Sequence, residues 1–164
     1  MSIFYRSRRV GKNGKEFWMI KFRTLVNGSD KQVFSNEATY TRFGKFLRRT
    51  KIDELPGLWN WIKGDLQLVG PRSEEKRTID ILPKNVQETI LSVRPGVTSP
   101  ASIYFFDEGT ILEQSSDPIS LYWKQIKPMK ILLDTWYISN KCFLLDIAVL
   151  WITFCKVIKA ILWK

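Results

Sequence analysis

The sequence predicts a mixed α/β (α+β) fold: a short β-hairpin and a small sheet packed with several helices. Two short apolar runs near the N-terminus have the composition of strands and flank a glycine-rich turn. Most of the later apolar residues recur at helical spacing. The chain of 164 residues, 45% hydrophobic and 26% charged, has the balance of a folded domain and is long enough to bury a core.

The hairpin is predicted from residues 3–10 and 16–25, which flank a turn over residues 11–14. Asn-Gly inside this turn is a strong hairpin signal. Because side chains alternate along a strand, the second strand places Lys21 and Arg23 on one face. Its other face carries apolar side chains: Trp18, Ile20 and Phe22.

The next segment is predicted as a loop over residues 26–38, followed by a basic helix over residues 39–49. A second helix has apolar residues at positions i, i+3, i+4 and i+7, and Gly64 is expected to end it. These apolar residues are Leu55, Leu58, Trp59 and Ile62. Asp53 and Glu54 fall at the helix entrance. Stabilisation by the helix N-terminus is a sufficient explanation for this acidic pair taken alone.

Farther along, residues 65–72 are predicted as a short strand that ends in a sharp turn. Residues 85–92 are predicted as a helix and residues 94–100 as a loop. Asp117-Pro118 has the pattern of a helix start, with a cap followed by proline at the first position. We expect helix from there to Asn140, with a break at Pro128.

The C-terminal segment suggests a division into residues 1–141 and an apolar, amphipathic helix over residues 142–164. One wide helical face is apolar: Phe143, Ile147, Leu150, Trp151, Phe154, Ile158 and Ile161. The most apolar part, residues 142–155, spans only about 21 Å as a helix, less than the ~30 Å hydrocarbon core of a bilayer. Two interpretations stay open: a helix packed in the core, and a helix lying in a membrane interface.

The composition restricts the chemistry. Histidine is absent, which excludes imidazole-based acid/base catalysis and zinc sites that need imidazole. Cys142 and Cys155 form no CxxC motif and suit no disulfide framework, so we expect a reducing, cytosolic compartment. Carboxylates, lysine, arginine and a metal held by oxygen remain as the plausible reactive groups.

The net charge of +10 is concentrated near the N-terminus. Residues 1–51 carry 13 Lys or Arg against 3 Asp or Glu, whereas residues 52–164 carry 13 of each. Such a basic segment usually faces phosphate, as nucleic acid, anionic lipid or a nucleotide. The asymmetry does not choose among these anions.

Six short motifs stand in a fixed order, each of them weak alone. They are RRVGKNGKEF (8–17), KFRT (21–24), RRTKIDELPGLWN (48–60), KGDLQLVGPR (63–72), RPGVTSPA (94–101) and LDTWYISN (133–140). Together they resemble the catalytic domain of the bacterial sugar transferase family, the monotopic phosphoglycosyl transferases. The resemblance covers nearly the whole chain.

The resemblance implies transfer of a sugar 1-phosphate from a UDP-sugar to a polyprenyl (undecaprenyl) phosphate, with release of UMP. The implied route passes through a covalent aspartyl-phosphosugar intermediate, and the implied cofactor is Mg²⁺. The implied location is the cytoplasmic face of the bacterial inner membrane. This step begins surface polysaccharide or glycoconjugate synthesis. A carboxylate nucleophile among cations needs little acid/base help, so the missing histidine agrees with it.

By the same resemblance, Asp53 matches the nucleophile and Glu54 the carboxylate associated with Mg²⁺. Other residues match positions that contact phosphate or nucleotide: Lys21, Arg23, Arg48, Pro71 and Arg72. Asp134 matches an acid in the supporting polar network. Each of these, taken singly, also suits an ordinary surface, turn or helix-end position; the ordered set favours the functional interpretation.

Two departures from the family pattern bear on the prediction. Members normally begin with an apolar re-entrant membrane helix, whereas this chain starts at the hairpin strand. Anchoring to an anionic membrane surface would then fall to the basic first third and the C-terminal helix, and a complete homologue could be a partner. After RPGVTSPA, Asp107 and Glu108 stand in a region where an arginine is expected.

Two other functions stay open. A truncated homologue could act as a binding module for a nucleotide sugar or a membrane surface without catalysis. Charge and aromatic content alone also suit a nucleic-acid-binding protein. We rank that last and expect no nucleic-acid partner, since no groove-reading motif is present.

Overall fold

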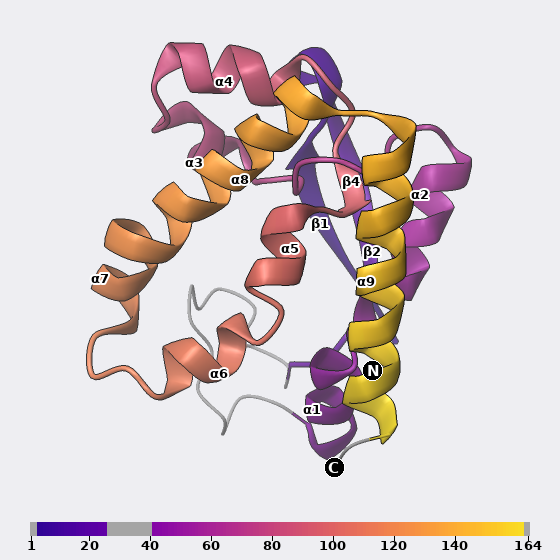
Figure 1. Ribbon diagram of the computed structural model, residues 1–164. Helices are drawn as coiled ribbons and strands as arrows, with labels where there is room; N and C mark the ends of the chain where they lie inside the picture. The colour runs from indigo at the N-terminus through magenta and orange to yellow at the C-terminus, as the bar shows by residue number, and fades with distance from the viewer. Residues whose placement is uncertain (1–2, 26–40, 163–164) are drawn as a thin grey trace.

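The computed structural model describes residues 3–25 and 41–162, and Figure 1 shows their arrangement. The predicted α/β class is confirmed: two small two-stranded sheets are packed with helices. The predicted loop over residues 26–38 and the first residues of the predicted basic helix lie outside the described residues.

The N-terminal hairpin is confirmed. β1 (Phe4–Val10) pairs antiparallel with β2 (Glu16–Phe22), in a register from Val10 opposite Glu16 to Phe4 opposite Phe22. In the turn, Asn13 and Gly14 have φ values of 57° and 76°. These two residue types tolerate the left-handed region best, which explains the hairpin signal. The second strand ends at Phe22, three residues before its predicted end.

The hairpin face that is buried differs from the predicted apolar face. Phe17 and Met19 are buried and pack with Leu66, whereas Trp18 is 53% exposed. Both faces of β2 carry apolar side chains, so alternation alone could not select the inner one. Lys21 shares the Phe17 and Met19 face and points inward with them.

Three helical segments follow: α1 (Arg42–Arg49), the 3₁₀ helix η3 (Ile52–Gly57) and α2 (Leu58–Ile62). The second predicted helix is therefore two segments, η3 and α2, and Gly64 (φ 82°) ends it as predicted. The predicted apolar stripe on it is not part of the buried core, since Leu55, Trp59 and Ile62 are exposed.

Buried Asn60 holds these helices against the hairpin. Its Nδ2 donates to the carbonyl of Trp18 at 2.8 Å and to Asp65 at 3.1 Å, and its Oδ1 accepts from the amide of Ile20 at 3.4 Å. The side chain thereby satisfies backbone groups of β2 that have no strand partner on that side. The contact fixes η3 next to Lys21.

The second sheet is a parallel pair, β3 (Gln67–Val69) and β4 (Gly96–Thr98). The prediction of a loop over residues 94–100 was wrong at β4, because a three-residue strand containing glycine carries no readable alternation. The two strand segments approach closely at Gly70 and Gly96, and Gly96 N donates to Pro71 O at 2.9 Å. This contact fixes the turn that carries Arg72.

The remaining helices build the other side of the molecule (Figure 1). They are α3 (Lys76–Asp80), α4 (Lys84–Leu91), α5 (Pro100–Tyr104), α6 (Glu108–Glu113), α7 (Pro118–Leu121), the π-helical turn η4 (Tyr122–Ile126) and α8 (Lys127–Asn140). The predicted cap is confirmed: Asp117 Oδ1 accepts from Ser120 N at 3.1 Å. The expected break at Pro128 was wrong: the π-helical turn ends at Ile126, and the chain stays helical across Pro128, the second residue of α8.

The C-terminal helix α9 (Phe143–Leu162) packs lengthwise on this body (Figure 1). Val149 is buried with Val69 and Tyr137, and the Tyr137 hydroxyl donates to Asp146 at 2.5 Å. Most of the wide apolar face predicted for this helix is exposed instead, including Phe143 and Trp151. No helix within the described residues is both long and apolar enough to span a bilayer.

Candidate functional site

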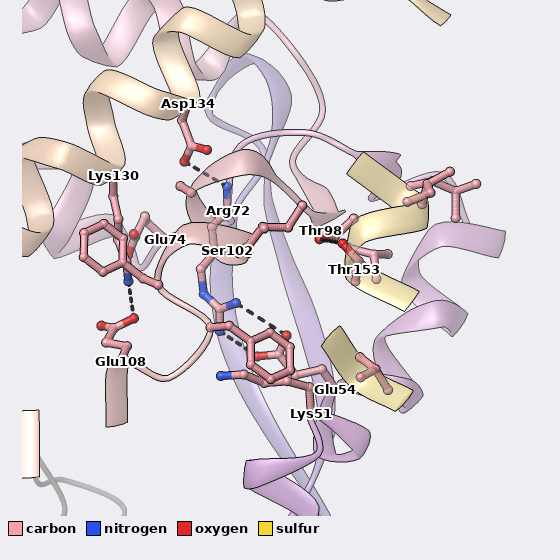
Figure 2. A pocket seen from close by; sticks show the side chains of 18 of the residues that line it. Lys51, Glu54, Arg72, Glu74, Thr98, Ser102, Glu108, Lys130, Asp134 and Thr153 are labelled. Carbon is pink, nitrogen blue, oxygen red and sulfur yellow. Dashed lines mark hydrogen bonds and ion pairs between the residues drawn. The ribbon is translucent and has the colours of Figure 1, made fainter. Parts of the chain in front are cut away.

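A cavity of about 300 Å³ lies between η3, β4, α5, α8 and α9 (Figure 2). One part of its wall is apolar: Leu55, Leu58, Leu68, Ile90, Val97, Leu150 and Val157 are among its residues. The other part carries ionisable groups: Lys51, Glu54, Arg72, Glu74, Glu108, Lys127, Lys130 and Asp134. Such a cavity suits a ligand with both an anionic and an apolar portion.

Glu54 is the centre of the polar wall. Its Oε1 accepts from Lys21 Nζ at 2.7 Å and from Arg72 Nη2 at 2.6 Å, while its Oε2 accepts from Arg72 Nη1 at 3.4 Å. Burial alone would raise the pKa of Glu54, but the charges of Arg72 and Lys21 hold it well below its usual range. Three residues from η3, β2 and the turn after β3 thus form one charged cluster.

Asp53 lies beside this cluster and is 8% exposed. Its Oδ1 is buried with no hydrogen-bond partner among the residues described. Burial and the neighbouring negative charge of Glu54 raise the pKa of Asp53, against the opposing charges of Lys21, Arg48 and Lys51. A carboxylate that is desolvated, unsatisfied and surrounded by cations has the environment expected of a nucleophile.

Lys51 holds a backbone conformation that lysine rarely adopts. Its φ of 58° lies in the left-handed region, between the end of α1 and the start of η3. Such strain costs on the order of 1 kcal/mol and tends to occur at functional sites. The side chain lines the cavity, and its Nζ lies 5.4 Å from the centre of the Phe106 ring. In the sequence Lys51 lies two residues before Asp53, and this position alone gave no reason to select it.

Asp134 reaches the same cavity from α8. It is 6% exposed, and its Oδ2 accepts from the backbone amide of Arg72 at 3.4 Å (Figure 2). Burial raises the pKa of Asp134 to about 6. This contact links Asp134 to the turn that presents Arg72, and its supporting role stays a prediction.

The structure brings together five of the eight predicted site residues: Lys21, Asp53, Glu54, Arg72 and Asp134. Pro71 is fully buried behind them and holds the Arg72 turn. Arg48 is exposed on α1 and influences Asp53 by charge. Arg23 lies over the ring of Tyr5 at 5.7 Å and, like Arg48, does not line the cavity. Their roles stay predictions.

Besides Lys51, the sequence pattern did not single out Glu74, Lys127 and Lys130 of the cavity, and it singled out Glu108 only as standing where an arginine is expected. Lys127 Nζ lies 2.7 Å from Glu74 Oε1, and Lys130 Nζ lies 2.5 Å from Glu108 Oε2. A signal was present, since Lys127 and Lys130 precede Asp134 at helical spacing on α8. Their glutamate partners come from distant segments and were not predictable from spacing.

The residues at the acidic pair suit a magnesium ion shared with a phosphate ligand. Over the described part of the chain, no three Asp, Glu or Cys side chains converge as a metal site. Mg²⁺, however, is commonly bound by one or two carboxylates together with substrate phosphates and water. The unsatisfied Oδ1 of Asp53 and the adjacent carboxylate of Glu54 offer such oxygen ligands.

Comparison with known proteins identifies the family of this chain. The family model described as bacterial sugar transferase matches residues 1–160. The sugar transferase EpsL of Bacillus subtilis is 35% identical over 160 residues, which cover 95% of this chain and 70% of EpsL.

Two longer relatives have more specific names. The UDP-glucose:undecaprenyl-phosphate glucose-1-phosphate transferase of Xanthomonas campestris is 32% identical, over 95% of this chain and 31% of that protein. The UDP-N-acetylgalactosamine-undecaprenyl-phosphate N-acetylgalactosaminephosphotransferase of Aeromonas hydrophila is 29% identical, over 92% of this chain and 34% of that protein. This chain thus spans about a third of the length of these two relatives. Since the family model matches almost the entire chain, the protein belongs to the bacterial sugar transferase family.

Proposed function

We propose that this protein transfers a sugar 1-phosphate from a UDP-sugar to undecaprenyl phosphate or a similar polyprenyl phosphate, the first step in assembling a surface polysaccharide or glycoconjugate. The observation that carries the proposal is the Asp53–Glu54 pair, set among Lys21, Arg72 and Lys51 beside a cavity that is part polar and part apolar. The names of the relatives point to the same reaction.

In the proposed mechanism, the Asp53 carboxylate attacks the phosphorus that bears the sugar. A bond forms between Asp53 oxygen and phosphorus, the bridging P–O bond breaks, and UMP leaves. An oxygen of the lipid phosphate then attacks the same phosphorus and releases the carboxylate, giving a polyprenyl diphosphate sugar. Lys21, Lys51 and Arg72 neutralise the charge of the diphosphate, which is the main requirement of phosphoryl transfer.

Magnesium is the proposed cofactor, with Glu54 as its principal protein ligand. When bound, the ion would neutralise charge on the phosphates. Glu54 accepts hydrogen bonds from two cations in this structure. It would therefore exchange at least one of these contacts for the metal, so we expect Mg²⁺ and substrate to bind together.

The proposed location is the cytoplasmic face of the inner membrane. The apolar cavity wall includes Leu150 and Val157 of α9, and the outer side of the same helix exposes large apolar residues. A lipid substrate could enter from a membrane that contacts α9, while the basic N-terminal third favours an anionic surface.

The direct test compares wild type with Asp53→Asn, supplied with UDP-sugars, Mg²⁺ and anionic vesicles that contain undecaprenyl phosphate. We expect release of UMP from wild type and a loss of at least ~10³-fold in the variant, since the nucleophile is removed. Asp80→Asn, which removes an exposed carboxylate on α3, serves as the matched control.

UMP release by Asp53→Asn at the wild-type rate would refute the proposed nucleophile. Calorimetric binding of a UDP-sugar to wild type without any turnover would instead favour the alternative of a binding module.

A further inference from the structure

The inner face of α8 is charged where a helix normally carries apolar residues. Its buried positions follow the core spacing i, i+3, i+7 and i+10 and hold Lys127, Lys130, Asp134 and Tyr137. The exposed side carries apolar residues instead, with Leu132 60% and Trp136 49% exposed. Burial of lysine and aspartate is costly, so this inverted pattern points to a functional demand on the inner face.

Lys130 is the buried cation that is best placed to act in the cavity. The residue is 8% exposed and lines the cavity. Its Nζ lies 2.5 Å from Glu108 Oε2, 5.8 Å from the centre of the Phe105 ring and 5.5 Å from that of Tyr122. Buried ion pairs contribute little net stability, because desolvation offsets their attraction. A purely stabilising role therefore explains the pair poorly.

The charges of the Lys130–Glu108 pair act on the site at Glu54. Burial and the positive charge of Arg72 lower the pKa of Lys130, while Glu108 opposes both. In turn, Glu108 helps to raise the pKa of Arg72, and its charge also acts on Lys51. Figure 2 shows Lys130 and Glu108 pointing toward one another, with Arg72 extending toward Glu54. Lys51, Arg72 and Lys130 thus form one electrostatic system with two glutamates.

We propose that Lys130 binds a phosphate group of the substrate, and that Glu108 occupies this phosphate site in the free protein. The phosphate would displace the Glu108 carboxylate from Lys130. This inference rests on the proposed function and extends it, since two substrates with phosphate groups must be held near one acidic pair. The phosphate could belong to the nucleotide or to the lipid, and the test distinguishes the two.

The neighbouring ion pair of α8, between Lys127 and Glu74, differs from the Lys130–Glu108 pair in what it holds together. Glu74 precedes α3, and the Glu74 carbonyl accepts from Val10 N of β1 at 2.8 Å, so this ion pair joins α8 to the hairpin. Glu108 instead begins the six-residue helix α6. Release of Glu108 from Lys130 would therefore leave the hairpin contacts intact.

The test uses calorimetric titration with UDP and, separately, with a short-chain prenyl monophosphate in detergent. Lys130→Met keeps an unbranched apolar side chain at this position and removes the charge. We expect it to weaken binding at least tenfold in one or both titrations, with recovery of affinity in Lys130→Arg. The titration that weakens identifies the source of the phosphate. Lys124→Met, an exposed lysine of η4, is the matched control.

The direction in which Glu108→Gln changes the binding affinity decides between the two interpretations of the pair. If Glu108 competes with the phosphate, this variant binds several-fold more tightly than wild type, and the gain disappears in Glu108→Gln/Lys130→Met. Equal affinity of Lys130→Met and wild type for both ligands would overturn the inference. So would parallel losses of affinity and of melting temperature in Lys130→Met and Glu108→Gln, which indicate a structural pair.

These failures are separate from failure of the proposed function. If wild type releases UMP but Lys130→Met binds both ligands normally, only the phosphate role of Lys130 is refuted. If wild type neither binds UDP nor releases UMP, the proposed function is refuted and the inference with it.

Discussion

Asp134 combines two properties that are rare in one side chain: it is buried, and its carboxyl group is only partly satisfied. Oδ2 accepts one long hydrogen bond from Arg72 N, while Oδ1 has no hydrogen-bond partner in the described regions. The pKa of about 6 follows from burial, which outweighs the nearby donors. Ionisation of Asp134 therefore lowers the stability of the folded protein, although its side chain contacts the turn that carries Arg72.

This property predicts a pH dependence of folding. The folded-state pKa of about 6 lies above the unfolded value of 3.8, so the folded protein binds more protons between these values. Stability due to Asp134 is therefore greatest below pH 4 and falls as the pH rises to about 6, by roughly 3 kcal/mol in total. We expect Asp134→Asn to remove this loss of stability with rising pH.

Urea unfolding of both proteins at pH 4 and pH 7 checks the prediction. We expect the free energy of unfolding of wild type, relative to the variant, to be lower at pH 7. Other carboxylates titrate in both proteins and cancel in the comparison. A relative stability that does not change with pH would contradict the assigned pKa.

At the scale of elements, the position of Arg72 depends on how closely β3 and β4 approach. A Cβ atom at Gly96 would lie less than 3.0 Å from the backbone of both Gly70 and Thr98. Only hydrogen fits there, and the neighbouring atoms are backbone that cannot rotate away. The close approach of the two backbone segments thus explains why glycine stands at Gly70 in the GPR motif and at Gly96 in the RPG motif.

We therefore predict that Gly96→Ala destabilises the protein by at least ~2 kcal/mol, because overpacking forces the backbone apart. Gly109→Ala is the matched control: a Cβ there meets nothing within 4 Å, and the residue lies inside α6. Alanine should stabilise that helix by up to ~1 kcal/mol. Thermal melts of the two variants should shift in opposite directions, and a tolerated Gly96→Ala would disprove the close approach.

At the scale of the whole molecule, large apolar residues are exposed on the outer side of α9 and on the η3–α2 stripe, next to a cavity whose wall is part apolar and part charged. Trp151 is 65% exposed and stacks on Phe154 at 6.0 Å between ring centres. Leu55 and Leu58 of the stripe line the same cavity as Leu150 and Val157 of α9. Together with the net charge of +10, this arrangement suits the surface of an anionic bilayer.

The proposed membrane contact predicts that Trp151→Glu weakens binding to vesicles containing anionic lipid at least tenfold in a flotation assay. The loss combines removal of a large apolar ring with added repulsion from the lipid headgroups. Ile119→Glu, an exposed position on α7 on the other side of the molecule in Figure 1, is the control and should bind as wild type. Equal binding by all three proteins would argue against α9 as the contact.

Some of this could be predicted from local patterns. Asn13-Gly14 predicted the hairpin because these residues tolerate the turn conformation, and Asp117-Pro118 predicted a helix start because capping is a local interaction. The motif order predicted that Asp53, Glu54, Arg72 and Asp134 belong to one site. The alternation of apolar and polar residues did not predict the buried face of β2, because both faces are apolar. It did not predict β4 as a strand, because that strand is too short.

The sequence by itself determined the fold class and the family resemblance and restricted the plausible reactive groups, since these depend on residue identity and on order along the chain. The tertiary structure decided which apolar faces are buried, because a face becomes core only when another element covers it. It also placed Lys21 and Arg72 on Glu54 and paired Lys130 with Glu108. These ion pairs join residues 18 to 33 positions apart in the chain, so their electrostatics arise only when the fold brings them together.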